Sequence, residues 1–463
     1  MISNKTSKVT ICIGGNNSFC QLPLIAKAND LDLRQSHIEP SIMKKQLTAL
    51  CLVVLSLGIP VVSLAAEDPT FAAQTVNALG LDLLAKGTAA NRNALLSPYS
   101  IQSALAMAYA GADGDTRTQM AKVLHYPQDE RSLHQSFASL REALVQVVKA
   151  SANEDTRKGS PGDPIVLTGA NRLFGQQGYK FRQPFLDVVK DSYSAPLETM
   201  DFISNSEKER GKINDWVEKQ TCKRICDLIP PGGLNRETRL VLVNAIYMKA
   251  PWAAPFDAKA TKPLPFHVNG GDSLNVPTMF KQGYMGYAKR EGYQVITVDY
   301  VGGDLQLLVL LPDKRNGLPT LEARLTPEIL QSCTKLNARE LELYMPKFKL
   351  EPPVCKLGKT LRSLGMTGAF DEPKGTANFD RMAPRKPDDY LCISEVFHKT
   401  FLALDEQGTE AAAATAVGMV NGACNSKFKS VVIEVRVDRP FLFAIQHCPS
   451  GACLFIGRVT DPR

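Results

Sequence analysis

The spacing of hydrophobic positions changes between the first third of the chain and the last. Apolar residues at helical spacing predict helices over residues 71–87, 97–111, 116–124, 182–193, 207–220 and 356–365. Short apolar or alternating runs predict strands over residues 93–96, 165–174, 198–202, 240–248, 294–300, 305–311, 340–350, 391–404, 431–437, 441–447 and 454–459. The polar residues 151–165 predict a surface loop. Because strands and helices do not alternate, the order favours an α+β fold with large, mainly antiparallel sheets.

Local signals add detail to three of these elements. Ser97 can cap the helix that follows it, with Pro98 at the first helical position, where no backbone N–H is needed. A Gly-Gly-Asp run at residues 302–304 indicates a hairpin turn between two predicted strands. Asn244 lies in the middle of the apolar strand 240–248, so its amide needs hydrogen-bond partners if it is buried.

The segment Glu406-Gln-Gly-Thr-Glu-Ala-Ala-Ala-Ala-Thr415 admits two interpretations. Its four alanines, with Thr409 as a cap, favour a helix locally. The segment nevertheless lies between two predicted strands, and composition alone favours an ordinary surface loop there. The alternative is a segment that changes conformation, because small side chains enter a packed sheet with the least obstruction.

Composition places the chain among soluble globular proteins. Of its 463 residues, 44% are hydrophobic and 22% are charged, which suits one large domain or two to three smaller ones. The net charge of +7 is modest, and no cluster of Lys and Arg is interleaved with aromatic residues. We therefore expect no nucleic-acid partner.

One apolar run, residues 47–66, has the features of a secretory signal peptide. Lysines precede it at residues 44–45, and small residues end it at Ala66. Pro60 and the short length argue against a stable membrane span. We therefore divide the chain into 1–42, an upstream segment outside the mature protein; 43–66, a signal peptide; and 67–463, one secreted or periplasmic domain. The alternative is a signal-anchor that keeps residues 1–42 as a cytoplasmic tail.

Cysteine spacing agrees with export. Cys222 and Cys226 form one close pair, and Cys448 and Cys453 form another around a Pro-Ser-Gly turn. In an oxidising compartment both pairs are predicted to be short-loop disulfides. The alternative is a zinc site, which needs four converging ligands, and no histidine stands at suitable spacing near both pairs. We expect neither a metal nor a cofactor.

The sequence gives no support to catalysis. It contains no Gly-x-Ser-x-Gly elbow, no His-Glu-x-x-His motif and no phosphate-binding loop. His398 has Ser394 on the same face at strand spacing, but the pattern favours a core histidine with satisfied hydrogen bonds. A hydrolase is therefore disfavoured, and we expect no catalytic residues.

A set of motifs runs in order from about residue 71 to the C-terminus. It includes Asn93-Ala-Leu-Leu-Ser-Pro-Tyr-Ser-Ile-Gln-Ser-Ala-Leu-Ala-Met107, Leu242-Val-Asn-Ala-Ile-Tyr247, Trp252, Pro346-Lys-Phe-Lys349, Ile393-Ser-Glu-Val-Phe-His-Lys399, Arg439-Pro-Phe-Leu-Phe443 and Phe455-Ile-Gly-Arg458. Together with residues 406–415, these motifs resemble the serpin (serine protease inhibitor) family, in particular an exported, bacterial-like inhibitory member. The sequence departs from the family pattern at Met248, Ala250 and Thr278, which are packing positions.

The resemblance implies the serpin fold, with three mainly antiparallel sheets, about eight or nine helices and an exposed reactive-centre loop over residues 406–430. It implies a monomer that inhibits serine proteases, and also cysteine proteases, as a suicide substrate. The cleaved loop would enter the main sheet as an extra strand while the protease stays covalently attached. The alternative is a non-inhibitory serpin that acts as a carrier or chaperone. Such members carry bulky, charged or proline residues at buried hinge positions, and this chain has small ones.

The resemblance also assigns roles to individual residues. The hinge is formed by Glu406, Gly408, Thr409, Glu410, Ala411, Ala412, Ala413, Ala414 and Thr415. The shutter is formed by Ser97, Ser100, Asn244 and His398. Trp252 and Lys347 mark the breach, the point where the sheet first opens, and Lys347 is expected to pair with Glu406. In the inserted strand Thr409, Ala411, Ala413 and Thr415 would face the core, while Glu410 would stay in water.

The bait bond is placed by counting along the loop. In inhibitory members it follows about the seventeenth residue from the hinge glutamate, which gives Gly422-Ala423 and suits elastase- or subtilisin-like proteases. The loop is longer than usual, so the register is open. Asn421, Ala423 or Cys424 could also precede the bond, and Lys427 or Lys429 would indicate trypsin-like targets.

Overall fold

The helices and strands are described here from a computed structural model. It describes residues 5–15, 68–127, 129–158, 163–268, 271–387, 389–410 and 431–463. All of these residues belong to one compact unit, which joins residues 1–18 to residues 67–463. The leader, residues 43–66, lies outside the described residues.

Nine α-helices are present in the described ranges. They are α2 (Pro69–Gly87), α3 (Pro98–Gly111), α4 (Gly114–Val123), α5 (Glu130–Lys158), α6 (Gln183–Tyr193), α7 (Phe202–Gln220), α8 (Leu318–Glu322), α9 (Pro327–Gln331) and α10 (Gly358–Ser363), with short 3-10 turns at Ala258–Ala260 and Gly368–Phe370. The surface loop predicted to begin at residue 151 begins later, because α5 continues to Lys158. A polar sequence can prolong a helix that has already formed, since adding a turn costs less than starting one.

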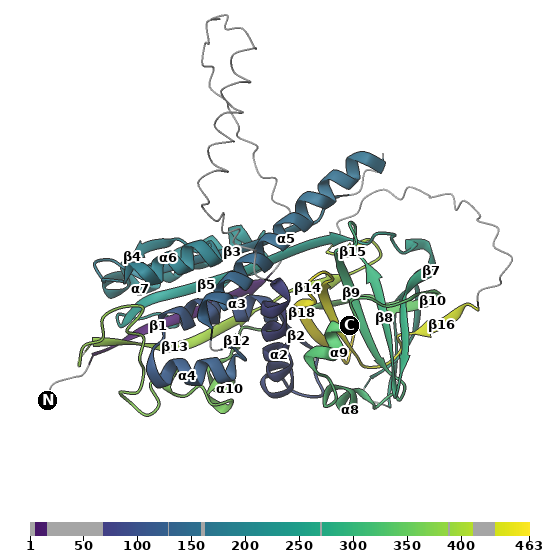
Figure 1. Ribbon diagram of the computed structural model, residues 1–463. Coiled ribbons are helices and arrows are strands. Elements are labelled where there is room, and N and C mark those ends of the chain that lie inside the picture. The colour runs from purple at the N-terminus through teal and green to yellow at the C-terminus, as the bar shows by residue number, and fades with distance from the viewer. Residues whose placement is uncertain are drawn as a thin grey trace, which may run out of the picture. The chain divides into compact units, whose positions relative to one another are not determined.

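The first sheet contains nine strands. In order across it are β11 (Phe348–Leu350), β14 (Leu402–Leu404), β15 (Gly408–Thr409), β5 (Thr238–Pro251), β1 (Lys5–Gly15), β13 (Asp389–Lys399) and β12 (Cys355–Lys356), with β3 (Val166–Gln176) and β4 (Leu197–Met200) alongside β5. The strand predicted over residues 391–404 is therefore two strands, β13 and β14. Figure 1 shows the long strands of this sheet running side by side beneath α6 and α7.

The second sheet also contains nine strands. They are β16 (Ile433–Arg436), β10 (Ala338–Pro346), β7 (Ser273–Arg290), β8 (Tyr293–Asp299), β9 (Leu305–Pro312), β17 (Phe441–His447), β18 (Ala452–Val459) and β2 (Ala94–Leu96), with β6 (Lys262–His267) on β7. Three sheets were expected, and in the described residues their strands are joined into two hydrogen-bonded networks. One reason is the length of β7, whose 18 residues pair with β6, β8 and β10 in turn.

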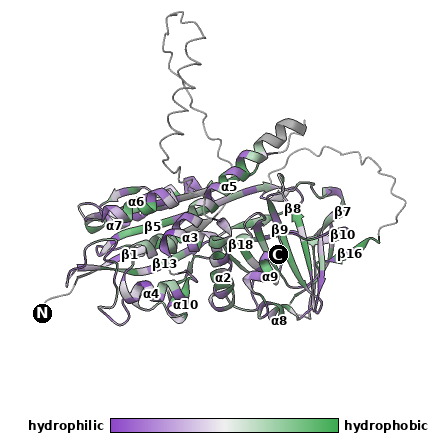
Figure 2. Cartoon of the chain, in the orientation of Figure 1, coloured by the Kyte–Doolittle hydropathy of each residue, from purple (hydrophilic) through white to green (hydrophobic). Residues whose placement is uncertain are grey.

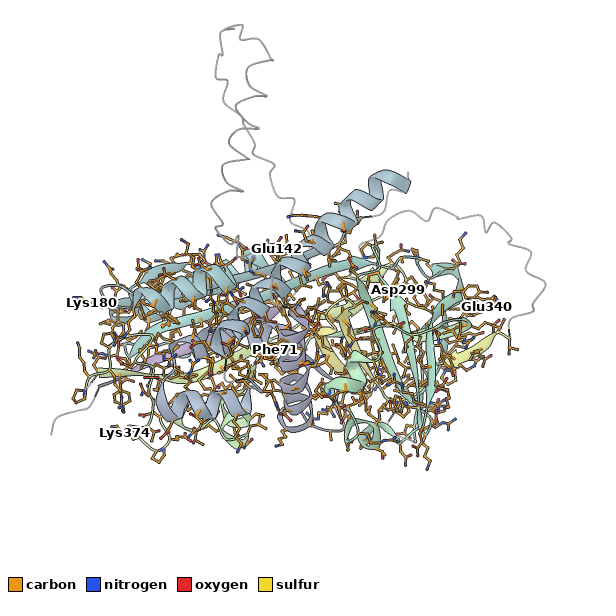
Figure 3. The ribbon with its side chains drawn as sticks, viewed as in Figure 1. Phe71, Glu142, Lys180, Asp299, Glu340 and Lys374 are labelled. Atoms are coloured by element: carbon orange, nitrogen blue, oxygen red, sulfur yellow. The ribbon has the colours of Figure 1, made fainter. Side chains whose placement is uncertain are left out.

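Strand β5 is covered on both faces, as its uninterrupted apolar sequence predicts. Leu240 and Leu242 point into the large core cluster. Val241 and Val243 point the other way, into a second cluster with Ile213 of α7. Figure 2 shows this strand as mostly hydrophobic. Figure 3 shows the contrast at the surface, where the exposed Lys180 and Lys374 lie at the periphery of the packed side chains.

Two local predictions are confirmed. Ser97 precedes α3, its side chain accepts a hydrogen bond from Ser100 N, and Pro98 stands at the start of the helix. The turn between β8 and β9 contains Gly302 and Gly303 in left-handed conformations, with φ of 86° and 76°. Glycine is favoured at such positions because it has no Cβ to clash with the backbone.

Strand β1 was not predicted. It lies between β5 and β13 and runs parallel to both, with residues 8–15 opposite residues 238–246 of β5. Figure 1 shows this N-terminal strand, in purple, within the sheet. Among the described strands, β5 and β13 are joined along this length only through β1.

Candidate functional site

The predicted hinge begins inside the first sheet. Gly408 and Thr409 form β15, which pairs with Leu404 on one side and with Ala250 and Pro251 of β5 on the other. Both pairings are antiparallel, because the chain folds back on itself after β14. A two-residue strand is thus already seated between β14 and β5.

Gly408 is required by the close approach of these backbones. A Cβ atom added at this residue would lie 2.2 Å from the carbonyl oxygen of Ala250. Its φ of 157° also lies in a range that L side chains rarely adopt, so backbone conformation and space both favour glycine here. Any larger residue would separate β15 from β5.

Glu406 is held by two side chains at the entrance to β15. Lys347 Nζ lies 2.7 Å from Glu406 Oε2, and Thr261 Oγ1 donates to Glu406 Oε1 at 2.7 Å. Burial acts to raise the pKa of Glu406, but the hydrogen bonds from Lys347 and Thr261 outweigh it, so the pKa is lowered. The expected pairing of Lys347 with Glu406 is therefore present. Thr261 carried no signal in the sequence.

Trp252 donates two hydrogen bonds to the turn that contains Glu406. Its indole Nε1 donates to the carbonyl of Asp405 at 2.9 Å, and its backbone N donates to the carbonyl of Gln407 at 2.9 Å. The indole ring stacks on Tyr300, with ring centroids 4.6 Å apart. The predicted breach residue thus contacts the start of the hinge directly.

Thr409 is buried where β15 ends. Its side chain is 1% exposed, and its hydroxyl is hydrogen-bonded to the hydroxyl of Tyr300. This burial agrees with the side that the strand alternation assigned to it. Tyr300 was missed by the sequence analysis, because a tyrosine at the end of a strand carries no sign of a distant partner.

Glu410 is the first residue after β15. Its carboxylate Oε1 lies 3.2 Å from Arg224 Nε, and the side chain is only 9% exposed. The exposure of Glu410 to water was predicted for the inserted strand, and it stays a prediction. The backbone turns away from β5 here, with φ of 58°, and Glu410 N donates to the carbonyl of Ala403. The described chain therefore leaves the sheet directly after Thr409.

The predicted shutter residues lie together beneath the middle of the sheet. Ser100 Oγ donates to Asn244 Oδ1, and Asn244 Nδ2 donates to Asn171 Oδ1 on β3. Asn171 in turn donates to the carbonyl of Tyr193 at 2.7 Å. The buried Asn244 thus has the hydrogen-bond partners that its position demanded. Asn171, a polar residue within a predicted strand, was the one signal that could have extended the set.

His398 takes part through the neighbouring segment. Its Nε2 accepts a hydrogen bond from Ser97 N at 3.2 Å, and the side chain is 1% exposed. Asn244 and His398 are both Cα partners of Ile13 in β1, so a complete strand separates their backbones. The site therefore consists of a hinge, a shutter and an occupied strand position between β5 and β13.

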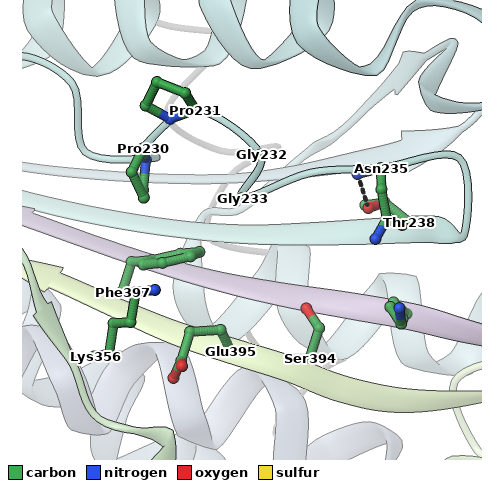
Figure 4. Close-up of a pocket in the computed structure, with 11 residues that line it drawn as sticks. Pro230, Pro231, Gly232, Gly233, Asn235, Thr238, Lys356, Ser394, Glu395 and Phe397 are labelled. Atoms are coloured by element: carbon green, nitrogen blue, oxygen red, sulfur yellow. Dashed lines mark hydrogen bonds between the residues drawn. The ribbon is translucent and has the colours of Figure 1, made fainter.

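A cavity lies at the starting end of β1. Its lining includes Lys8 of β1, Thr238 of β5, Ser394 and Glu395 of β13, and Pro230. Figure 4 shows β1, in purple, between β5 and β13 at this cavity. Ser394 and Glu395 also hold their own local contacts, since Ser394 Oγ donates to Val9 O and Glu395 Oε1 accepts from Gly358 N.

The remaining predicted loop residues lie outside the described part of the chain. They are Ala411, Ala412, Ala413, Ala414, Thr415, Asn421, Gly422, Ala423, Cys424, Lys427 and Lys429. Their assigned roles stay predictions.

The expected disulfides are not formed in the structure, and that prediction is corrected. In the hairpin of β17 and β18, Cys453 stands opposite Gln446 and not opposite Cys448. Cys226 donates its thiol hydrogen bond to the carbonyl of Lys223 at 3.3 Å. Burial raises the pKa of both Cys448 and Cys453 to about 12, which keeps both thiols protonated near neutral pH.

None of the helices in the described ranges is both long and apolar enough to cross a membrane.

Comparison with known proteins gives concordant results. The sequence model of the family described as "Serpin (serine protease inhibitor)" matches residues 74–462. Serpin B6 of Macaca fascicularis is 38% identical over 406 residues, covering 86% of this chain and 99% of that protein. Leukocyte elastase inhibitor of Bos taurus is 39% identical over 381 residues, covering 80% and 93%. The crystal structure of uncleaved ovalbumin matches with a TM-score of 0.70 and 30% identity, covering 85% of this chain and 100% of that one.

Proposed function

This chain belongs to the serpin family, and we propose that it is a suicide inhibitor of serine endopeptidases, and also of cysteine proteases. The observation that carries the proposal is β15. Gly408 and the buried Thr409 already form an antiparallel strand of two residues between β14 and β5. The small residues that follow it in the sequence can extend that strand down the sheet.

The chemistry is an interrupted proteolysis. The nucleophilic hydroxyl of the target protease attacks the carbonyl carbon of Gly422, and the bond to the nitrogen of Ala423 breaks. The new amino terminus leaves with a proton, and an ester joins the protease to Gly422. Insertion of the freed loop then carries the protease away before water hydrolyses the ester. The uncleaved form is less stable than the inserted form and persists because a kinetic barrier prevents insertion before cleavage.

Small residues in the hinge decide which step is faster. Ala411, Ala413 and Thr415 would follow Thr409 on the core side, and none of them is charged or bulky. Such a strand enters a closing sheet with little resistance. The same feature disfavours the carrier or chaperone alternative.

Gly422-Ala423 is proposed as the bait bond, which implies a protease that accepts small residues. One relative carries the name leukocyte elastase inhibitor, which is consistent with this choice. Asn421, Ala423, Cys424, Lys427 and Lys429 remain alternatives for the residue before the bond. The mass of the peptide released on reaction would distinguish them.

We also propose that the inhibitor is exported as a monomer. The support is the leader at residues 43–66, with its lysines, apolar run and small-residue end. N-terminal sequencing of the protein recovered outside the cell should begin at residue 67. A chain recovered only inside the cell with its leader intact would contradict export.

The function is tested by incubating the chain from residue 67 with elastase, subtilisin, trypsin and papain. Denaturing electrophoresis should show a complex that survives boiling with at least one of them. Thr409→Arg provides the comparison, because it should be cleaved in the loop without forming the complex. Cleavage without a complex for every protease would contradict the proposal.

A further inference from the structure

Strand β1 occupies the position between β5 and β13 that the cleaved loop of a loop-inserting inhibitor would fill. It pairs with β5 through residues 8–15 and with β13 through residues 5–14. A reactive-centre loop that inserts as proposed would need the same edges of the same two strands. Each backbone edge can pair with one strand at a time.

The register shows where the two would collide. Thr409 stands opposite Ala250, so a continuing antiparallel strand would bring Ala411 to Met248 and Ala413 to Ile246. Ile246 is already the partner of Gly15, and the pairs of β1 continue from there to Thr238. Residues 247–249 of β5 are therefore the only stretch left between β15 and β1. The loop could enter by about three residues and would then meet β1.

The inner face of β1 is built into the core. Val9 and Ile11 are 0% exposed and belong to the same cluster as Leu240 and Leu242, their neighbours on β5. Helix α3 also contacts β1. The alternation of these residues along β1 matches that of β5, so the strand is inserted in a register that buries its apolar side chains.

Polar contacts hold the outer face and the starting end of β1. Thr10 Oγ1 lies 2.9 Å from Ser394 Oγ, and Ser7 Oγ donates to Asp389. Lys8 Nζ is paired with the carboxylate of Glu237, and Lys8 N donates to the carbonyl of Glu237 at 2.8 Å. Ser394 and Asp389 lie on β13, and Glu237 directly precedes β5, so polar groups on both sides of β1 contact the segment.

We propose that residues 5–15 act as an internal plug: they fill the strand position that the reactive-centre loop needs, and a chain that retains them in place cannot complete insertion. Such a chain is cleaved as a substrate and releases the protease. This inference rests on the proposed function, because it requires that the loop insert between β5 and β13.

The plug lies on the N-terminal side of the predicted leader in the sequence. Residues 5–15 precede the leader at 43–66, and cleavage at residue 67 separates them covalently from the rest of the chain. The family match, which begins at residue 74, does not include them. A chain that begins at residue 67 therefore has no plug.

The test uses the full chain from Met1 and pancreatic elastase as the probe. The variant Val9→Asp/Ile11→Asp places two charges where β1 is buried and should expel the plug. We expect at least a tenfold rise in boiling-resistant complex per cleaved molecule relative to wild type. Val145→Asp/Ile203→Asp makes the same change at exposed aliphatic residues of α5 and α7 and should behave as wild type. A wild-type full chain that forms complex as well as the plug variant would overturn the inference.

A milder pair of variants guards against misfolding of the first. Lys8→Glu sets two carboxylates against each other at Glu237 and should increase complex formation by about two- to fivefold, the range expected for one exposed ion pair. Adding Glu237→Lys restores an ion pair and should return the yield to wild type. If neither change alters the yield while both proteins are folded, the inference fails.

Thermal unfolding after loop cleavage separates this inference from the proposed function. Cleaved Val9→Asp/Ile11→Asp should gain about 10 °C in its unfolding midpoint, because its loop can insert, whereas cleaved wild type should gain little. That difference, without any covalent complex, would support the plug and contradict inhibition. Equal gains in both proteins would overturn the plug whether or not complexes form.

Discussion

Lys347 Nζ and Glu406 Oε2 lie 2.7 Å apart at the point where the chain turns from β14 into β15. Lys347 lies between β10 and β11, so the ion pair joins the hinge to the segment that connects the two sheets. Glu406 is buried at its side chain, while Lys347 remains about one third exposed. The pair therefore holds the first residue of the hinge without removing the lysine from water.

Replacing Glu406 with Gln should lower the free energy of unfolding by about 1 kcal/mol. The value is small because Lys347 is partly exposed and water screens the ion pair. The pKa of Glu406 in the folded chain lies below its ordinary value of 4.5, so the contribution is complete above that pH. It is lost as the pH falls through the lowered pKa. Urea unfolding of both proteins at neutral pH and below pH 4 measures this, and the gap between them should close at the lower pH. A gap that is the same at both pH values would contradict the assignment.

Replacing Thr409 with Arg should convert the inhibitor into a substrate. A guanidinium cannot enter the buried position beside Tyr300 without losing its hydration, so insertion slows and hydrolysis of the ester wins. Complex yield should fall more than tenfold, with loop cleavage retained. Thr409→Val is the matched control, since it is similar in size and uncharged, and it should keep most of the complex. Equal yields from the Arg and Val variants would count against insertion.

Replacing Asn244 with Ala should cost about 1–3 kcal/mol of stability, because it leaves the buried hydroxyl of Ser100 and the amide of Asn171 without their partner. The urea midpoint of the chain from residue 67 measures the loss. Asn337→Ala, at an exposed position, should change stability by no more than about 0.5 kcal/mol. Similar losses from the two variants would show that the hydrogen-bond network at Asn244 does not contribute to the stability of the fold.

His447 predicts a pH dependence in the weakly acidic range. Burial lowers its pKa to about 4, against a smaller opposing effect of Asp304, and its Nδ1 lies 2.8 Å from Ser450 Oγ. A depressed pKa gives stability that is complete above the unfolded value of 6.5 and is lost as the pH falls towards 4. The loss should be on the order of 3 kcal/mol and should be absent in His447→Gln. His125→Gln, at an exposed residue, should retain the slope; if His447→Gln also retains it, this origin is wrong.

Local chemistry accounts for what the sequence could predict of the fold. Ser97 with Pro98, and the glycines between β8 and β9, specify their turns through neighbouring residues, so their structure can be read from short windows. The central strand β5 was recognisable because burial on both faces requires an uninterrupted apolar run. Asn244 stood out within it because a buried amide demands partners.

The parts that were missed depend on residues far apart in the chain. Arg224 reaches Glu410 across 186 positions, and nothing near either residue indicates the other. Strand β1 has an ordinary alternating sequence, and its pairing with β5 crosses more than 200 residues. It also precedes a leader-like segment, so the sequence places it in the upstream segment outside the mature protein. Helix α5 was not predicted, and residues 151–158 at its end were assigned to a surface loop because they are polar, although a helix that has already formed can continue through such residues.

Intact-mass analysis of the reaction between elastase and the chain from residue 67 tests the proposed inhibition most directly. We expect an adduct whose mass equals that of the protease plus the intact inhibitor minus that of the released peptide 423–463, and we expect that peptide as a separate species. Free protease together with two unlinked fragments of the inhibitor, and no adduct at any time point, would contradict it.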